Sequence, residues 1–408
     1  MSGVSRPDGI RRHNVALLLD SVHRHGPSTR AELTARLELN RSTIGVLVSD
    51  LCALGLVQET VPPRTARAPR AGRPSHVVAP RADGPYAVAV DVEVDRLTAA
   101  AVRVGGELVA RRVERLPPSR RSAASVARAI ARIVDRLAED MPSAAWPVGV
   151  GVSIPGTVSL PEGIVEAAPN LEWSSEPLGQ MLADLLPPGT TVTLGNDADL
   201  GVLAEHLRGA ARDAADVVYV NGKVGVGGGI LLGGRPLSGR DGLAGEIGHT
   251  VFDPDGPPCR CGGSGCVENY IGEAALLRLA GRTDPPDAEA VSAVMRAARS
   301  GDPAACAGVV GVARSLGQVL ANLVNLLNPQ VIVLGGALAD VLSLARTDIT
   351  AALDRQAMGA ARRMVQIRTS GLGSDSSLLG AAELAFRPLL ADPSAVVASR
   401  AAPLLGAG

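Results

Sequence analysis

The sequence predicts an α/β protein in which a small winged helix-turn-helix domain precedes a larger body of two α/β lobes. Two observations lead to this prediction. Residues 14–60 contain three helical patterns followed by β-prone runs, and after Pro85 strands and helices alternate in two halves of similar order. At 408 residues and 46% hydrophobic, the chain is too long for one core and apolar enough to fold throughout.

The first two predicted helices are marked by an apolar stripe and by a cap. Between residues 15 and 22, apolar side chains recur at the spacing of one helical face. Thr29 and Glu32 have the spacing of a capping box, in which each side chain bonds the other residue's backbone N–H. We therefore expect the second helix to open at Thr29 and to end near Leu37.

The third predicted helix begins after Asn40, a favourable N-cap, and runs to Gly55. The face opposite its apolar stripe carries short polar side chains and an arginine. Such residues at the start of the last helix in a tri-helical unit are what reading the DNA major groove requires. The candidate DNA contacts on this helix are Arg41, Ser42, Thr43, Gly45 and Ser49.

An Arg- and Pro-rich segment separates two β-prone runs at residues 57–61 and 75–78. We interpret it as a wing whose Arg70 and Arg73 reach phosphates or the minor groove. The alternative is an interdomain linker, and one segment can serve as both.

Charge is distributed unevenly along the chain. Residues 1–80 carry 11 arginines against 6 acidic residues, a formal charge of +5, and the remainder carries −6. Only the N-terminal segment suits a polyanion such as DNA, although a solvated basic face would look the same. We assign residues 1–80 to a DNA-binding domain with its wing or linker.

The remaining chain predicts two lobes built alike. Each half contains a strand, a β-hairpin, a long helix and another strand, which suggests duplication, and a ligand commonly binds between lobes. The first half has strands at 87–90 and 148–153 and a helix at 123–141, and the second has strands at 217–220 and 331–334 and a helix at 304–327. We expect lobe 1 to span 86–200, with a return of 376–392, and lobe 2 to span 201–375.

The sequence predicts a cytoplasmic protein without a membrane partner. We find no apolar run near the roughly 20 residues that span a bilayer, and the Arg-containing start lacks the apolar region of a secretory signal. Three of the five cysteines crowd together, which suggests a metal site instead of disulfides.

Four potential metal ligands fall within 18 residues. Three thiolates and one imidazole make a closed tetrahedral set, which is typical of structural zinc. The alternative is a group of free or buried cysteines. The predicted zinc ligands are His249, Cys259, Cys261 and Cys266.

Two further patterns leave alternatives open. The glycine-rich run at 222–234 lacks the Lys-Ser or Lys-Thr ending of a P-loop, so a tight hairpin and a phosphate-binding loop are almost equally favoured. Several amides and carboxylates beside glycine, proline or apolar runs could bind sugar hydroxyls, although each alone could be a cap or turn residue.

Residues 86–392 resemble the ROK family, which contains sugar kinases and sugar-responsive repressors. The matching motifs are Gly151-Val-Ser-Ile-Pro155-Gly156, Ala168-Pro-Asn170-Leu-Glu-Trp173, Asn196-Asp197-Ala198, the glycine run, Ala244-Gly-Glu246-Ile-Gly-His249, the cysteine cluster with Glu268, Val333-Leu-Gly335-Gly336 and Leu379-Gly380-Ala381-Ala382.

The resemblance implies an actin-like, hexokinase-type fold, a duplicated ribonuclease H-like architecture with sugar bound between the lobes. It also implies that His249 presents one ring nitrogen to zinc and the other to a sugar hydroxyl. The sugar-contacting positions implied by the family are Asn170, Asn196, Asp197, Glu246, His249 and Glu268.

The chain departs from the family's kinases after Asp91. Those kinases have a glycine-rich turn there for ATP phosphates, whereas Glu93 and Val94 place a carboxylate and a β-branched side chain in this chain. We therefore expect no catalytic residue, and Asp197, the kinases' general base, becomes a vestigial base that only accepts hydrogen bonds.

The combined expectation is a sugar-responsive transcriptional regulator, most simply a repressor. Its expected partners are operator DNA with an inverted repeat, a sugar or sugar phosphate effector, and further copies in a homodimer or tetramer. Two alternatives stay open at this point: an active sugar kinase with an accessory domain, and a regulator controlled by a protein partner.

Overall fold

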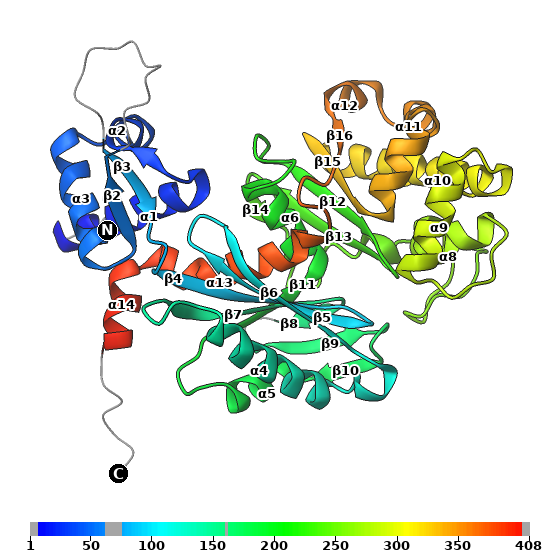
Figure 1. Ribbon diagram of the computed structural model, residues 1–408. Helices are drawn as coiled ribbons and strands as arrows, with labels where there is room; N and C mark the ends of the chain where they lie inside the picture. The colour runs from blue at the N-terminus through cyan, green and yellow to red at the C-terminus, as the bar shows by residue number, and fades with distance from the viewer. Residues whose placement is uncertain (1–6, 62–75, 160–161, 402–408) are drawn as a thin grey trace.

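The computed structural model describes residues 7–61, 76–159 and 162–401. Figure 1 shows three parts, with a small N-terminal domain beside one α/β lobe and a second lobe on the far side. The small domain and the first lobe are in contact through the C-terminal helices.

The N-terminal domain is a tri-helical unit with a small antiparallel sheet of order β1-β3-β2. The predicted caps are confirmed: Thr29 and Glu32 form a reciprocal capping box, and the Asn40 side chain accepts from the backbone N–H of Thr43. The first helix begins before its apolar stripe does, at Pro7. The elements are α1 (Pro7–His25), β1 (Ser28–Thr29), α2 (Arg30–Leu37), α3 (Arg41–Ala53), β2 (Val57–Thr60) and β3 (Val77–Pro80).

The first lobe contains a five-stranded sheet of order β11-β7-β4-β5-β6 and a small sheet of order β10-β9-β8. Strands β11, β7 and β4 are parallel, and β5 and β6 continue antiparallel. The elements are β4 (Pro85–Val92), β5 (Arg96–Arg103), β6 (Leu108–Arg115), η1 (Pro118–Arg120), α4 (Ala123–Glu139), β7 (Trp146–Ile154), β8 (Thr157–Ser159), β9 (Ile164–Ala168), β10 (Trp173–Glu176), α5 (Leu178–Leu185) and β11 (Val192–Asn196).

The second lobe contains a five-stranded sheet of order β14-β13-β12-β15-β16. The elements are β12 (Val217–Gly222), β13 (Val226–Leu232), β14 (Arg235–Pro236), η2 (Ile247–His249), α7 (Glu268–Ile271), α8 (Glu273–Leu279), α9 (Ala288–Arg299), α10 (Pro303–Leu327), β15 (Val331–Gly336), α11 (Ala337–Gln356), α12 (Gly359–Met364), β16 (Gln366–Thr369) and η3 (Gly373–Asp375).

The two large sheets have the same topology. In the first lobe, β11, β7 and β4 pair in parallel, and β5 and β6 extend the sheet antiparallel beyond β4. In the second lobe, β16, β15 and β12 pair in parallel, and β13 and β14 extend the sheet antiparallel beyond β12. Strand β4 therefore corresponds to β12, and β7 to β15. This correspondence confirms the repeated order of elements that the sequence predicted.

Three further helices join the parts. Helix α6 (Asp197–Leu207) packs against β12 and β13 of the second lobe and against α13 (Ser376–Ala391). Helix α13 lies across β4 and β7 of the first lobe and also contacts α1. The sequence did not predict α14 (Pro393–Ala401), which packs on α1 and α13.

Helix α10 is long and apolar enough to cross a membrane, judged by length and composition alone, with a mean hydropathy of 1.4 in its best window. The expectation that no segment approaches this length and apolarity is therefore wrong for α10. Its apolar residues are explained by packing, because they lie in the core of the second lobe against α8, α9 and α11.

Candidate functional site

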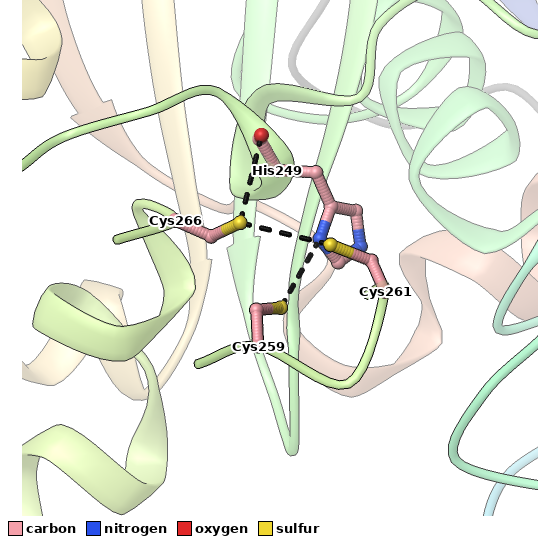
Figure 2. Close-up of side chains that lie close together, drawn as sticks. All are labelled: His249, Cys259, Cys261 and Cys266. Atoms are coloured by element: carbon pink, nitrogen blue, oxygen red, sulfur yellow. Dashed lines mark hydrogen bonds between the residues drawn. The ribbon is translucent and has the colours of Figure 1, made fainter. Parts of the chain in front are cut away.

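The four predicted metal ligands lie together in the structure (Figure 2). One ligand atom from each residue lies within 4.8 Å of the others. Cys259 Sγ is 3.7 Å from His249 Nδ1, and Cys261 Sγ is 3.7 Å from Cys266 Sγ. A tetrahedral ion with metal–sulfur bonds of about 2.3 Å separates its sulfur ligands by about 3.7 Å, so the spacing fits a metal centre.

The three cysteines are free, and the 3.7 Å between Cys261 Sγ and Cys266 Sγ is much longer than an S–S bond of about 2.05 Å. His249 is the last residue of η2, and Cys266 lies two residues before α7, so a metal would connect these elements through the cysteine loop. Four protein ligands leave no open coordination position, so the cluster could hold a metal with a structural role.

The cysteine loop also touches two of the predicted sugar ligands. The Cys259 thiol donates to Glu268 Oε1 at 2.9 Å, and Arg260 Nη1 donates to Asn170 Oδ1 at 2.9 Å. Asn170 lies in the turn between β9 and β10 of the first lobe, so Arg260 connects this loop to the opposite lobe. The sequence reasoning did not select Arg260, although it stands between two predicted metal ligands.

Asn196 and Asp197 lie at the junction of β11 and α6. The Asn196 side chain caps α6, accepting from the backbone N–H groups of Ala198 and Asp199, and donates to the Gly156 carbonyl at 2.9 Å. Its amide groups thus have partners within the protein. This position fixes Asp197 at the first turn of α6.

The glycine-rich run forms the β12–β13 hairpin, and its glycines pass close to the candidate ligands. A Cβ on Gly225 would lie 3.1 Å from Glu268 Oε2 and 3.5 Å from Asn170 Nδ2, and one on Gly227 would lie 3.7 Å from Asp197 Oδ1. Larger residues in this strand would enter the space between these polar groups. The antiparallel pairing of β12 with β13 confirms the predicted hairpin.

Two carboxyl groups at the start of α6 have raised pKa values. Burial raises the pKa of Asp197 to about 6. Burial, with repulsion from Glu246 and Asp197, raises the pKa of Asp199 to about 7. Asp199 was not selected from the sequence, although only Ala198 separates it from the Asn196-Asp197 pair. Perturbed carboxyl groups of this kind gather at functional sites.

Lys223, in the turn between β12 and β13, is the only lysine of the chain. Its Nζ lies 3.2 Å from Glu93 Oε1 and 3.7 Å from Asp91 Oδ2. Burial opposes its charge, but attraction by Asp91 and Glu93 raises the pKa of Lys223 above its usual value. The sequence reasoning placed Glu93 correctly after the first strand but missed its partner, which belongs to the second lobe.

Glu93 is held from both sides, because Arg96 of the first lobe also pairs with it. Burial acts to raise the pKa of Glu93, but Lys223 and Arg96 together hold it below its usual value. Asp91 is buried and accepts from Ser153 Oγ at 2.6 Å. An ionised acid and a lysine thus join the lobes at the end of β4.

The candidate DNA-reading face of α3 is open to solvent. Arg41, Ser42 and Ser49 are exposed, and Thr43 and Gly45 are half-buried. Ser42 and Thr43 contribute to a shallow hollow between α1 and α3. Arg70 and Arg73 lie outside the described residues.

Fold and site together define a class of protein in which a winged helix-turn-helix domain is joined to a sugar-kinase-like body. The profile of the ROK family matches residues 87–387, and that of the MarR family matches residues 8–68. The chain belongs to the ROK family.

Regulators of this family match nearly the whole chain. The N-acetylglucosamine repressor of Escherichia coli is 26% identical over 397 residues, covering 95% of this chain and 95% of the repressor. The crystal structure of a ROK family transcriptional regulator, a homolog of the E. coli MLC protein, superposes with a TM-score of 0.76 at 25% identity and covers 95% of this chain and 99% of that chain. A glucokinase of Streptomyces coelicolor is 33% identical over 258 residues, covering 59% of this chain and 81% of the kinase.

Proposed function

We propose that this chain is a sugar-responsive transcriptional repressor that binds operator DNA through α3 and a sugar or sugar phosphate where its two lobes meet. The observation that carries the proposal is the combination of a winged helix-turn-helix domain with a kinase-like body. In this body the turn after β4, where kinases of the family bind ATP phosphates, is occupied by the Glu93–Lys223 ion pair. Neither feature alone would separate a regulator from a kinase. In this proposal the chain acts in the cytoplasm.

The DNA reader consists of residues 1–80 in this proposal. Asn40 holds the first turn of α3, so Arg41 and Ser42 face solvent in a defined orientation. In a homodimer or tetramer, two α3 helices would enter successive major grooves of an inverted repeat. Arg70 and Arg73 would add contacts from the wing.

The effector site draws on lobe 1 (86–200, with 376–392) and on lobe 2 (201–375). Asn170, Asp197, Glu246 and Glu268 would bind hydroxyl groups, with Asn196 holding Asp197 in place by its cap. Zinc is the metal that best suits three cysteines and one histidine. It would fix His249 with Nδ1 toward the metal and Nε2 free for a hydroxyl.

Phosphotransfer is disfavoured in this chain because a carboxylate occupies the turn where kinases of the family seat ATP phosphates. Lys223 does not relieve the problem, since its ammonium is already engaged by Glu93 and Asp91. A nucleotide would have to break these pairs and bring further negative charge next to Asp91. We therefore assign no catalytic residue and treat Asp197 as a hydrogen-bond acceptor.

The test is a gel-shift titration of the purified chain on the DNA upstream of its own gene, with a panel of D-glucose, D-xylose, N-acetylglucosamine and their phosphates. We expect tight binding that one member of the panel weakens by about 5- to 150-fold, the usual range of allosteric coupling. An ATP-consumption assay with the same panel should give no turnover. If the chain does not bind the DNA but consumes ATP with a sugar of the panel, the kinase alternative is established instead.

The alternative of a regulator controlled by a protein partner gives a different result. DNA binding would then be retained, and no sugar in the panel would relieve it. The panel with purified components thus separates the three functions.

A further inference from the structure

Three titratable side chains from distant parts of the sequence meet between the DNA-reading domain and the first lobe. His23 of α1 and Glu383 of α13 are 1% and 3% exposed, and Arg208, which follows α6, is 12% exposed. Burying such groups costs free energy unless they are paired, so a cluster of this kind requires close mutual contacts.

The contacts of the cluster are short and complementary. Arg208 Nε donates to Glu383 Oε1 at 2.5 Å, and His23 Nε2 lies 2.7 Å from Glu383 Oε2. The backbone N–H of Gly105 donates to His23 Nδ1 at 3.0 Å, and His23 Nε2 also lies 2.7 Å from Arg208 Nη2. Burial acts to raise the pKa of Glu383, but attraction by His23 and Arg208 holds it below the usual value.

Arg208 is the centre of this cluster because it contacts three segments. Its Nη1 donates to the carbonyl oxygens of Gly105 at 2.7 Å and His23 at 3.3 Å. The turn between β5 and β6 closes tightly over the guanidinium, since a Cβ on Gly106 would lie 2.3 Å from it. A displacement of Arg208 would therefore disturb α1, this turn and α13 together.

Helix α6 connects this cluster to the candidate sugar site. The helix begins with Asp197 and ends at Leu207, immediately before Arg208, a length of about 16 Å at 1.5 Å per residue. Leu200 and Ala204 of α6 share one apolar cluster with α13 and with the core of the DNA-reading domain. A rigid element thus joins a sugar-facing carboxylate to an arginine buried against α1.

We propose that α6 transmits sugar binding from Asp197 to the DNA-reading domain through the Arg208–Glu383–His23 cluster. The inference rests on the proposed function and adds the path by which sugar binding affects the DNA-reading domain. Arg208 is a positioning residue that touches neither DNA nor sugar. A packed cluster of hydrogen-bonded side chains has discrete arrangements, so a small shift of α6 can change the orientation of α1.

The test uses Arg208→Lys in the full chain and measures the coupling between sugar and DNA binding separately from the affinity for each ligand. Lysine keeps the charge but lacks the planar fork that reaches Glu383 and two carbonyls at once. The quantities are the DNA Kd by anisotropy without sugar, the same Kd at saturating sugar, and the sugar Kd by calorimetry. The sugar used is the member of the panel above that relieves DNA binding most in the unmodified chain.

We expect Arg208→Lys to keep DNA Kd and sugar Kd within about twofold while the ratio of the two DNA Kd values falls toward one. The matched control is Arg368→Lys. Arg368 pairs with Asp213 and with the Ala210 carbonyl in the loop after α6, yet no hydrogen bond or ion pair joins it to α1 among the described residues. Its coupling ratio should stay unchanged. An unchanged ratio in folded Arg208→Lys would overturn the inference.

A second measurement covers the case in which the variant does not fold. Hydrogen exchange of the unmodified chain, with and without that sugar, should change amide protection at residues 20–25, 205–210 and 380–386. Unaltered protection in these three segments, alongside sugar relief of DNA binding, would refute the route while leaving the proposed function intact. An unmodified chain that binds no DNA, or that no sugar relieves, refutes the proposed function itself.

Discussion

Lys223 Nζ and Glu93 Oε1 lie 3.2 Å apart, although the two residues belong to different lobes and are 130 positions apart in the sequence. Asp91 lies within 3.7 Å of the same ammonium. This arrangement places an internal cation between two carboxylates at the end of the first strand. Its energetic role can be measured directly.

Lys223→Met should destabilise the protein by about 3 kcal/mol, because it leaves Asp91 and Glu93 without their shared cation in a largely buried place. Urea unfolding followed by circular dichroism measures the change. Glu93→Gln in the Lys223→Met background should recover part of the loss. The matched control is Arg282→Met, which breaks an exposed pair with Asp284 and should cost less than about 1 kcal/mol. Equal effects of both variants would contradict the assigned role.

Cys259→Ser should remove the metal. We expect elemental analysis to find about one zinc per unmodified chain and a large loss in the variant, with a lower Tm because the loop carrying Arg260 has lost its anchor. Cys306→Ser is the control, since Cys306 lies in α10 and donates to the Ala298 carbonyl instead. Zinc retained by Cys259→Ser, or lost equally from both variants, would argue against the site.

Sugar binding should weaken as the pH falls through about 6. Asp197 must be ionised to accept two hydroxyl protons, and its pKa is raised to about 6, so roughly a tenth remains ionised at pH 5. Calorimetric titration between pH 5 and 7.5 should therefore show a drop of about tenfold in affinity. Asp197→Asn should bind more weakly and without this pH dependence. A profile of the variant that follows the unmodified chain would show that Asp197 is not the titrating group.

The Asp197 carboxyl also affects the stability of the fold, and its contribution changes with pH in the opposite direction to sugar affinity. Its folded-state pKa lies above its ordinary value of 3.8, so the folded chain binds more protons than the unfolded chain between about pH 4 and 6. The contribution of Asp197 to stability is therefore favourable at low pH and is lost as the pH rises through about 6. The difference in unfolding free energy between the unmodified chain and Asp197→Asn should follow this direction.

Arg41→Ala should weaken binding to the upstream DNA by about tenfold or more, the effect of losing one base or phosphate contact. Arg41 is exposed at the first position of α3, so the loss should leave folding unchanged. Fluorescence anisotropy at several salt concentrations measures both affinity and salt dependence. Arg346→Ala, an exposed arginine on α11, serves as the control and should bind normally. Equal affinity of Arg41→Ala and the unmodified chain would place the DNA contact elsewhere.

Features that depend on neighbouring residues were predictable from the sequence alone. The capping box of Thr29 and Glu32, the Asn40 cap and the alternating elements of the two lobes all arise from local bonds and local periodicity. The cluster of potential metal ligands belongs to the same group, because all four residues lie within one segment of 18 residues. The family motifs added which polar groups to examine.

Features that depend on distant residues required the tertiary structure. Glu93 was recognised as unusual, but its partner Lys223 comes from the other lobe. His23 and Glu383 are separated by 360 positions, and nothing in either local sequence marks them as a buried pair. The physical reason is that a charge is stabilised or excluded by what surrounds it in space, and these surroundings exist only once α1, α6 and α13 pack together.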